Sequence, residues 1–185
     1  TFHALAEGSH TFDAMAVVKP WQPTMVGAGP PERFEGQRVR AGYFRVLGVS
    51  PSRGRNFQPA DDQFRGPNVV IPSDRLWRRS FAGDSTILGK PVRLDDNLFT
   101  VIGIMPSSFE NVLAPAAELW APLQYNPSLP LQGREWGHHL RMVGRLRPDV
   151  SADQAGDELK EMLRPFAQIY AKGYECCGGA PDRMV

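Results

Sequence analysis

The chain has 185 residues, of which 42% are hydrophobic and 22% charged, and its 21 basic residues are balanced by 20 acidic ones. This composition excludes an intrinsically disordered chain, and the interspersed charges exclude the basic surface by which proteins bind nucleic acid. No apolar run approaches the roughly 20 residues that cross a bilayer. Because the chain begins at Thr1, without an initiator methionine or a signal peptide, we expect it to be a piece of a longer protein whose flanks could hold membrane segments.

The first forty residues predict one helix followed by two strands. Apolar residues recur at helical spacing over residues 2–16, with an interruption near Gly8. Residues 17–26 favour a strand, although two prolines weaken this prediction. After a turn at residues 27–31, residues 34–40 favour a second strand.

The segment GYFRVLGVSPSRGRNF, residues 42–57, combines aromatic, aliphatic, glycine and proline residues and has no usual nucleophile beyond two serines. Tyr43–Leu47 predicts a single helical turn. Gly48 ends this turn, because glycine readily adopts the left-handed conformation found after a helix. The rest of the segment predicts irregular structure. Asp61 and Asp62 follow it, and paired aspartates are typical of a polar turn.

The middle of the chain predicts a buried strand, a capped helix and a hairpin. Residues 68–71 form a short apolar run, and Ser73 supplies a side-chain oxygen that can cap a helix. Gly83 ends this helix. Residues 91–105 contain two apolar stretches on either side of an Asp-Asp-Asn turn, which predicts a β-hairpin. Residues 118–123 predict one more strand.

The last third of the chain predicts a loop, a strand and a helix. Residues 125–136 contain two prolines and predict a loop, whereas residues 140–147 alternate as in a half-buried strand. Ser151 and Gln154 have the spacing of a capping box at the start of a helix. Pro165 predicts a kink or an early end of that helix. This mixture of helices, strands and a hairpin predicts an α+β fold.

The sequence contains no recognisable motif for catalysis or cofactor binding. Residues 83–90 lack the glycine spacing and the hydroxyl of a phosphate-binding loop. His138 and His139 are adjacent, so on a strand their side chains point to opposite faces rather than to one metal ion. Cys176 and Cys177 have no further ligands nearby, and free thiols are favoured over a strained vicinal disulfide. We therefore expect no catalytic site, no cofactor and no metal.

The four tryptophans divide by their surroundings in the sequence. Trp77 and Trp120 lie in apolar elements, which favours core packing. Trp21 and Trp136 lie in proline-rich segments, which favours a surface that contacts a partner. These last two tryptophans are the candidate site residues of the chain.

A set of spaced motifs runs through the chain in a fixed order. The motifs are Tyr43-Phe44-x-x-Leu47-Gly48-x-x-Pro51-x-x-Gly54-Arg55-x-Phe57 followed by Asp61-Asp62, Leu76-Trp77-x-x-x-Phe81, Gly83-Asp84, Ile87-Leu88-Gly89-Lys90, Leu94-x-x-x-x-Phe99-Thr100-Val101-Ile102-Gly103-Ile104-Met105-Pro106, Glu118-Leu119-Trp120-x-Pro122-Leu123, and Arg145-Leu146-Arg147-Pro148-x-Val150-Ser151. In this order they resemble the periplasmic core domain of MacB-like ABC transporter permeases, in the FtsX-like permease superfamily, over about residues 1–170. The pattern most resembles acidobacterial permeases with duplicated membrane units.

The resemblance implies a domain outside the cytoplasmic membrane, set between the first and second transmembrane helices of a permease. It implies a porter-like subdomain of βαβ elements, which we map to residues 1–56 and 126–185, and a smaller inserted subdomain at residues 57–125. It implies that the ATPase is a separate cytoplasmic domain or subunit. The implied role is to couple ATP-driven movement of the transmembrane helices to substrate export or to a periplasmic partner, such as an adaptor protein or a second permease unit.

Two other interpretations of the sequence stay open. A periplasmic module that binds a small ligand or a peptide would have an enclosed pocket lined by Trp21 and Trp136. A hydrolase would have two close carboxylates with opposed pKa values. A permease domain should instead place residue 1 and the end of the helix near Tyr170 on the same side, because both ends return to the membrane.

Overall fold

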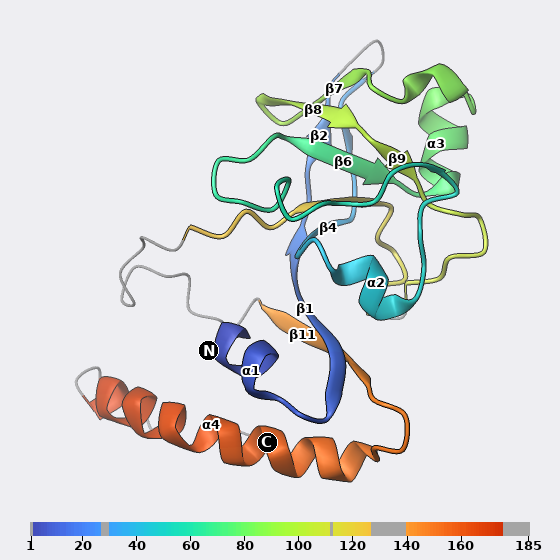
Figure 1. Ribbon diagram of the computed structural model, residues 1–185. Coiled ribbons are helices and arrows are strands. Elements are labelled where there is room, and N and C mark those ends of the chain that lie inside the picture. The colour runs from blue at the N-terminus through green and yellow to red at the C-terminus, as the bar shows by residue number, and fades with distance from the viewer. Residues whose placement is uncertain (1, 27–29, 112, 127–139, 176–185) are drawn as a thin grey trace. The chain divides into compact units, whose positions relative to one another are not determined.

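The computed structural model describes residues 2–26, 30–111, 113–126 and 140–175, and it mixes helices with strands along the chain (Figure 1). The helices are α1 (Phe2–Gly8), α2 (Tyr43–Leu47), α3 (Asp74–Phe81), the 3-10 helix η1 (Ser85–Ile87) and α4 (Ala152–Glu175). The strands are β1 (Phe12–Trp21), β2 (Thr24–Met25), β3 (Glu32–Arg33), β4 (Gly36–Val39), β5 (Arg53–Gly54), β6 (Val69–Pro72), β7 (Pro91–Leu94), β8 (Asn97–Val101), β9 (Gly103–Ile104), β10 (Leu119–Pro122) and β11 (Arg141–Leu146). The predicted α+β fold class is confirmed.

Within the described ranges, nine of the strands form one sheet in the order β11-β1-β4-β10-β6-β8-β7-β2-β3, and β5 pairs with β9 separately. The sheet is mixed, because β4 pairs antiparallel with β1 and parallel with β10. The predicted hairpin is confirmed by the antiparallel pairing of β7 with β8. Only Gln22 and Pro23 separate β1 from β2, although the two strands lie near opposite ends of the order. The sheet therefore curls on itself.

The chain forms two compact units. Unit 1 comprises Thr1–Ala14 and Gly144–Val185, and unit 2 comprises Met15–Val143. The chain thus passes from one unit to the other inside β1 and again inside β11. The predicted porter-like subdomain (residues 1–56 and 126–185) and inserted subdomain (residues 57–125) have different bounds from these two units. The assignment of the subdomains stays a prediction.

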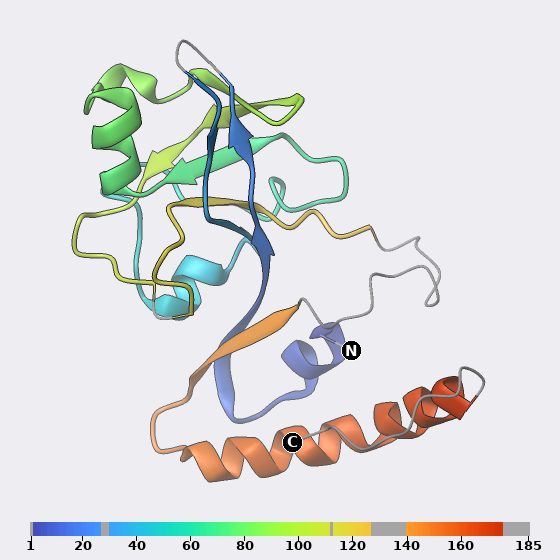
Figure 2. The ribbon, with the colours of Figure 1, turned by 180° about the vertical axis from the view of Figure 1, so that it is seen from behind.

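The core of unit 2 lies between the curled sheet and α3, which Figures 1 and 2 show beside β6 and β9. Ser73 caps α3 as predicted, since its hydroxyl accepts a hydrogen bond of 3.0 Å from the Leu76 amide. Leu76 and Trp77 are buried on the inner face of the helix. Trp77 also donates a hydrogen bond of 2.9 Å from Nε1 to the carbonyl of Asp84, so its predicted packing in the core is confirmed.

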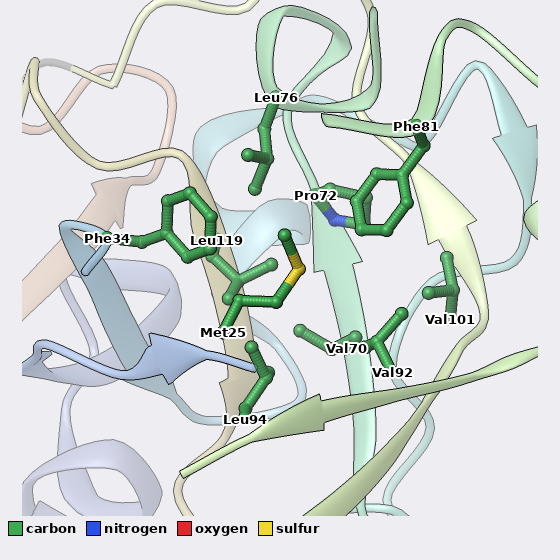
Figure 3. Close-up of a pocket in the computed structure, with 10 residues that line it drawn as sticks. All are labelled: Met25, Phe34, Val70, Pro72, Leu76, Phe81, Val92, Leu94, Val101 and Leu119. Atoms are coloured by element: carbon green, nitrogen blue, oxygen red, sulfur yellow. The ribbon is translucent and has the colours of Figure 1, made fainter. Parts of the chain in front are cut away.

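A small cavity of about 10 Å³ lies in this core (Figure 3). Its lining consists of apolar side chains alone, from Met25, Phe34, Val70, Pro72, Leu76, Phe81, Val92, Leu94, Val101 and Leu119. This volume is at the lower limit for holding one water molecule, and a water would find no polar partner there. The cavity is thus a packing void rather than a ligand site.

The segment of residues 42–57 is built around two glycines with left-handed backbone. Gly48, with φ of 71°, ends α2 as predicted, and its N–H bonds back to the carbonyl of Arg45. Gly54 has φ of 74° in β5 and lies opposite Gly103 of β9. A Cβ at position 54 would lie only 2.2 Å from the carbonyl oxygen of Ile102. The predicted irregular segment thus contains a short strand that needs glycine at this position.

An aromatic cluster fills the space between α2 and β10. Phe44 is fully buried at its centre, with ring centroids 5.4–5.9 Å from its own centroid. These neighbours are Tyr43, Phe57, Phe109 and Trp120. Trp120 is 1% exposed, which confirms its predicted core packing. The aromatic residues of the first motif therefore specify a core rather than a site.

Asp61 and Asp62 lie in a turn, as predicted, but both are buried there. Asp61 accepts two hydrogen bonds from the guanidinium of Arg55, at 2.6 and 3.0 Å, and one of 2.7 Å from the amide of Gln58. Burial raises the pKa of Asp61, but the bonds from Arg55 and Gln58 outweigh burial, so its pKa lies below the ordinary value.

Asp62 joins three segments that are distant in sequence. Its carboxylate lies 3.1 Å from Nε of Arg40 and accepts hydrogen bonds of 3.1 Å from the amide of Ala41 and 2.9 Å from the amide of Gln124. The carboxylate thus fixes the entry to α2 and the chain leaving β10 to one loop. Because both aspartates are occupied by cations and amide groups, they serve to shape the domain.

Two predicted elements differ from the structure. Residues 12–16, expected to continue a helix, belong to β1, because the pairing of β1 within the sheet, where β11 is its other neighbour, overrides the local helical spacing. The early end predicted at Pro165 is wrong, because α4 runs through this residue to Glu175, whereas the alternative of a kink stays a prediction. A proline there removes only the hydrogen bond to the carbonyl of Glu161, and both side chains are on an exposed part of the helix.

Candidate functional site

Of the two tryptophans predicted to contact a partner, the structure describes only Trp21. Trp21 is half-buried in β1, with the guanidinium carbon of Arg38 4.1 Å from its ring centroid and the ring of Phe99 at 5.6 Å. Burial lowers the pKa of Arg38 to about 10, against the opposing attraction of Asp95. Trp136 lies outside the described residues. A partner-contact role for the two tryptophans stays a prediction.

The strongest polar constellation of unit 1 surrounds the carboxylate of Glu158 on α4. Its Oε2 accepts hydrogen bonds from the hydroxyls of Ser9, at 2.5 Å, and of Thr11. Backbone amides add two more, from His10 at 2.7 Å and from Thr11 at 3.2 Å. We call Ser9, His10, Thr11 and Glu158 the end clamp, because it joins the turn between α1 and β1 to the C-terminal helix.

Local sequence explains how Glu158 reaches this turn. The predicted capping box is confirmed: the Ser151 amide donates to the Gln154 side chain at 2.9 Å, and the Gln154 amide donates to the Ser151 hydroxyl at 3.2 Å. This box fixes the start of α4, so that Ala155, Glu158 and Met162 follow at intervals of three and four residues on one face. Ala155 is buried in unit 1.

Close packing supports the end clamp on both sides. A Cβ at Gly8 would lie 2.9 Å from Cε of Met162, so α1 approaches α4 closely at its last residue. The backbone of Arg147, after β11, donates to the carbonyl of Thr11 at 2.9 Å. Its Nε group donates to the carbonyl of Phe12 at 3.3 Å. The N-terminal segment is therefore held by α4 and by the end of β11.

The chemistry of the end clamp is that of a fixed acceptor. Hydrogen bonds from the hydroxyls of Ser9 and Thr11, and then from the two amides, lower the pKa of Glu158 from 4.5 to about 2. Its partners are neutral donors, so hydrogen bonding rather than an ion pair keeps the carboxylate charged. A group with such a pKa is a poor proton donor or acceptor near neutral pH.

The clamp should weaken in acid. A carboxylate whose pKa is lower in the folded chain stabilises the fold fully above its unfolded value of 4.5 and loses that contribution as the pH falls toward 2. We expect Glu158→Gln to destabilise the chain at pH 7, and the difference from wild type to shrink below pH 4.5. Chemical denaturation of both proteins between pH 7 and pH 2.5 measures this difference.

Glu161→Gln is the matched control, because Glu161 lies on the same helix and makes an exposed ion pair of 2.7 Å with Arg164. It should change stability little at any of these pH values. A constant gap between wild type and Glu158→Gln from pH 7 to pH 2.5 would show that charge on Glu158 does not hold the clamp.

The described ranges give two further findings on possible sites. They contain no group of three or more His, Cys, Asp or Glu residues placed to hold a metal ion, and none of their helices is long and apolar enough to cross a membrane. The predictions for His138, His139, Cys176 and Cys177 fall on residues outside these ranges.

The end clamp was not predicted from the sequence. Ser9 and Thr11 precede Glu158 by 149 and 147 residues, so no local spacing links them. Serine and threonine after a glycine are typical of a turn, and a glutamate on a helix is typical of a solvated face. Covariation between these positions in related sequences is the signal that could have found the clamp.

Most of the chain is similar to a known protein family. Residues 4–162 match the model of the family described as MacB-like periplasmic core domain. The macrolide export ATP-binding/permease proteins MacB of Salmonella paratyphi A and Salmonella typhi are each 27% identical to this chain over 128 residues. These alignments cover 68% of the chain and 19% of the relatives, so the chain spans about a fifth of their length.

Solved structures share the fold. The periplasmic region of MacB from Actinobacillus actinomycetemcomitans matches with a TM-score of 0.65 at 18% identity, covering 87% of this chain and 72% of that one. A domain of a putative permease from Porphyromonas gingivalis matches with a TM-score of 0.63 at 20% identity, covering 88% and 68%. The family predicted from the ordered motifs is thus confirmed, and the chain belongs to the MacB-like periplasmic core domain family of ABC transporter permeases.

Proposed function

We propose that this domain transmits ATP-driven movement of the transmembrane helices of its permease to an exported substrate or a periplasmic partner, without chemistry of its own. It would stand at the periplasmic face of the bacterial inner membrane. The ATP-binding part would be a separate cytoplasmic domain or subunit, and the partner an adaptor protein or a second permease unit. The Salmonella relatives are named for macrolide export and ATP binding, which makes export the favoured role.

The end clamp is the observation that best supports this proposal. In the permease architecture implied by the resemblance, both ends of the domain continue into transmembrane helices. Here α1 and α4 belong to the same compact unit, and Glu158 ties the segment after α1 to α4 through four hydrogen bonds. Movement of either helix would therefore reach both ends together, as a coupling element requires.

A spin-label experiment on the full permease in lipid nanodiscs tests the proposal. Leu98 is 54% exposed on β8 and offers a labelling position in unit 2. We expect ATP to change the distance between a label at Leu98 and gadolinium-labelled lipid headgroups, measured by double electron–electron resonance. In Glu158→Gln this change should fall by at least half while ATP hydrolysis continues, because the two ends no longer move as one.

A control variant and two contrary outcomes complete the spin-label experiment. Glu161→Gln should keep both the ATP-driven distance change and the hydrolysis rate, since its ion pair is exposed. An unchanged distance in the wild-type permease during ATP turnover would contradict mechanical coupling. An unaltered response in Glu158→Gln would show that the end clamp is not part of the coupling path.

The subdomain roles are part of the same proposal. We assign the porter-like subdomain to residues 1–56 and 126–185, which include the end clamp. The inserted subdomain, residues 57–125, contains the core of α3 and the hairpin of β7 and β8. In this arrangement the inserted subdomain would face the partner, while the porter-like subdomain would receive the movement.

A further inference from the structure

A second cavity lies in unit 2, between neighbouring strands and the loop that precedes β10. It has a volume of about 220 Å³. Its lining is Val18, Pro20, Glu35, Gly36, Gln37, Leu113, Ala114, Ala116, Ala117 and Arg141. This volume matches roughly seven water molecules or one group the size of an amino acid. Unlike the void beside α3, this cavity has charged and polar groups in its lining.

The amide of Gln37 has a defined orientation. The Oδ1 atom of Asn111 accepts hydrogen bonds from two backbone amides, of Leu113 at 3.1 Å and Ala114 at 3.3 Å, so Nδ2 of Asn111 faces Gln37. That Nδ2 group donates to Oε1 of Gln37 at 2.7 Å, and Nε1 of Trp120 donates to the same oxygen at 3.0 Å. Both partners are N–H donors, so this end of the Gln37 amide is its oxygen.

The other end of the same amide is left without a partner. Gln37 is only 5% exposed and lines the cavity. The Gln37 oxygen has a third neighbour, the hydroxyl of Tyr43 at 3.3 Å, in addition to Asn111 and Trp120. The Nε2 group of Gln37, in contrast, donates no hydrogen bond to any residue that the structure describes. Since Nε2 is not among the fully buried side-chain atoms without a partner, it is open to the cavity and free to donate to a molecule there. The cavity therefore suits a molecule that brings an acceptor to Gln37.

Charges in the lining narrow the chemistry of that molecule. Arg141 comes from β11, and Glu35 immediately precedes β4, with β1 between these two strands in the sheet order. Two strand spacings separate them by roughly 10 Å. The floor between them is apolar, formed by Val18 and Pro20 of β1. A cation, an amide donor and an apolar floor together suit a carboxylate attached to an apolar group.

We propose that this cavity binds the carboxylate of a small apolar amino acid derivative or of a peptide C-terminus. The carboxylate accepts hydrogen bonds from Nε2 of Gln37 and from the guanidinium of Arg141. The apolar side chain lies on Val18 and Leu113, and the ligand N–H faces Glu35. This site does not depend on the proposed mechanical coupling, because the end clamp belongs to unit 1 and the cavity to unit 2.

Binding to the 185-residue chain tests the site with three probes, by isothermal titration and by amide chemical shifts. N-acetyl-L-leucine carries the carboxylate, N-acetyl-L-leucinamide lacks it, and Gly-Gly-Leu presents the carboxylate at a peptide end. We expect the first or the third to bind, with shifts at Gln37 and Ala117, and the leucinamide to bind at least tenfold more weakly. If Gly-Gly-Leu binds and N-acetyl-L-leucine does not, the ligand of the cavity is a peptide C-terminus. If both bind equally well, the cavity accepts any small apolar carboxylic acid.

Three variants assign the binding to this cavity. Arg141→Gln removes the exposed cation, Gln37→Glu keeps the acceptor oxygen but removes the amide donor, and Ala116→Leu fills the cavity from its loop. Each should weaken binding about tenfold, as loss of one charge-assisted hydrogen bond or of the ligand's space predicts. Arg93→Gln is the control, because Arg93 is exposed on β7 and is not part of the lining.

The same measurements can overturn the site. Binding of neither carboxylate probe would mean that the cavity holds only water. Equal affinity for the leucinamide would exclude carboxylate recognition. Unchanged binding by Arg141→Gln and Ala116→Leu, both at exposed positions, would place the ligand elsewhere, even if Gln37→Glu fails to fold.

Discussion

Replacing Trp120 with alanine should lower the free energy of unfolding by about 4 kcal/mol, the middle of the range for buried large aromatic residues. Trp120 is 1% exposed, and its ring lies 5.6 Å from that of Phe44 and 5.5 Å from that of Phe109. Alanine would leave a cavity between them and would remove the donor to Oε1 of Gln37. Urea denaturation followed by circular dichroism measures the change.

Trp120→Phe separates packing from hydrogen bonding. It keeps a ring against Phe44 but removes the Nε1 donor, so it should cost about half as much as the alanine variant. A loss below about 1 kcal/mol in Trp120→Ala would contradict the central place of this ring in the core.

Gly54→Ala should destabilise the chain by about 3 kcal/mol or more, because two penalties add. The first is the left-handed backbone at φ of 74°, which costs an ordinary residue roughly 1–2 kcal/mol. The second is the contact of the new Cβ with the carbonyl of Ile102, 2.2 Å away, which only a backbone shift between β5 and β9 can relieve. Thermal unfolding of the two proteins gives the difference.

Gly89→Ala is the matched control for this substitution. Gly89 has a similar φ of 80°, but a Cβ there would meet nothing within 4 Å. It should therefore cost only the backbone penalty of roughly 1–2 kcal/mol. Equal losses at the two positions would show that the pairing of β5 with β9 adjusts freely to a side chain.

Local chemistry in the sequence predicts much of this fold. The hairpin of β7 and β8, the cap at Ser73 and the capping box at Ser151 each depend on residues within a few positions of one another, and each is confirmed. The left-handed end of α2 at Gly48 is of the same kind. Such elements are predictable because the contacts that stabilise them are adjacent in sequence.

Contacts between distant segments explain the rest. Residues 12–16 have helical spacing, yet they form a strand because pairing across the sheet decides their conformation. Asp62 has the sequence context of a turn but is buried, since Arg40 and Gln124 reach it from far along the chain. Glu158 depends on Ser9 and Thr11 in the same way. A single sequence does not show which residues will meet.

The passage of the chain between its two units limits how movement can travel. The backbone crosses from unit 1 to unit 2 at Ala14–Met15 and returns at Val143–Gly144, each time within a strand. Extended backbone has almost no slack along its axis but accommodates twisting. In the proposed mechanical role, a pull along the covalent path would therefore pass from one unit to the other with little loss of travel.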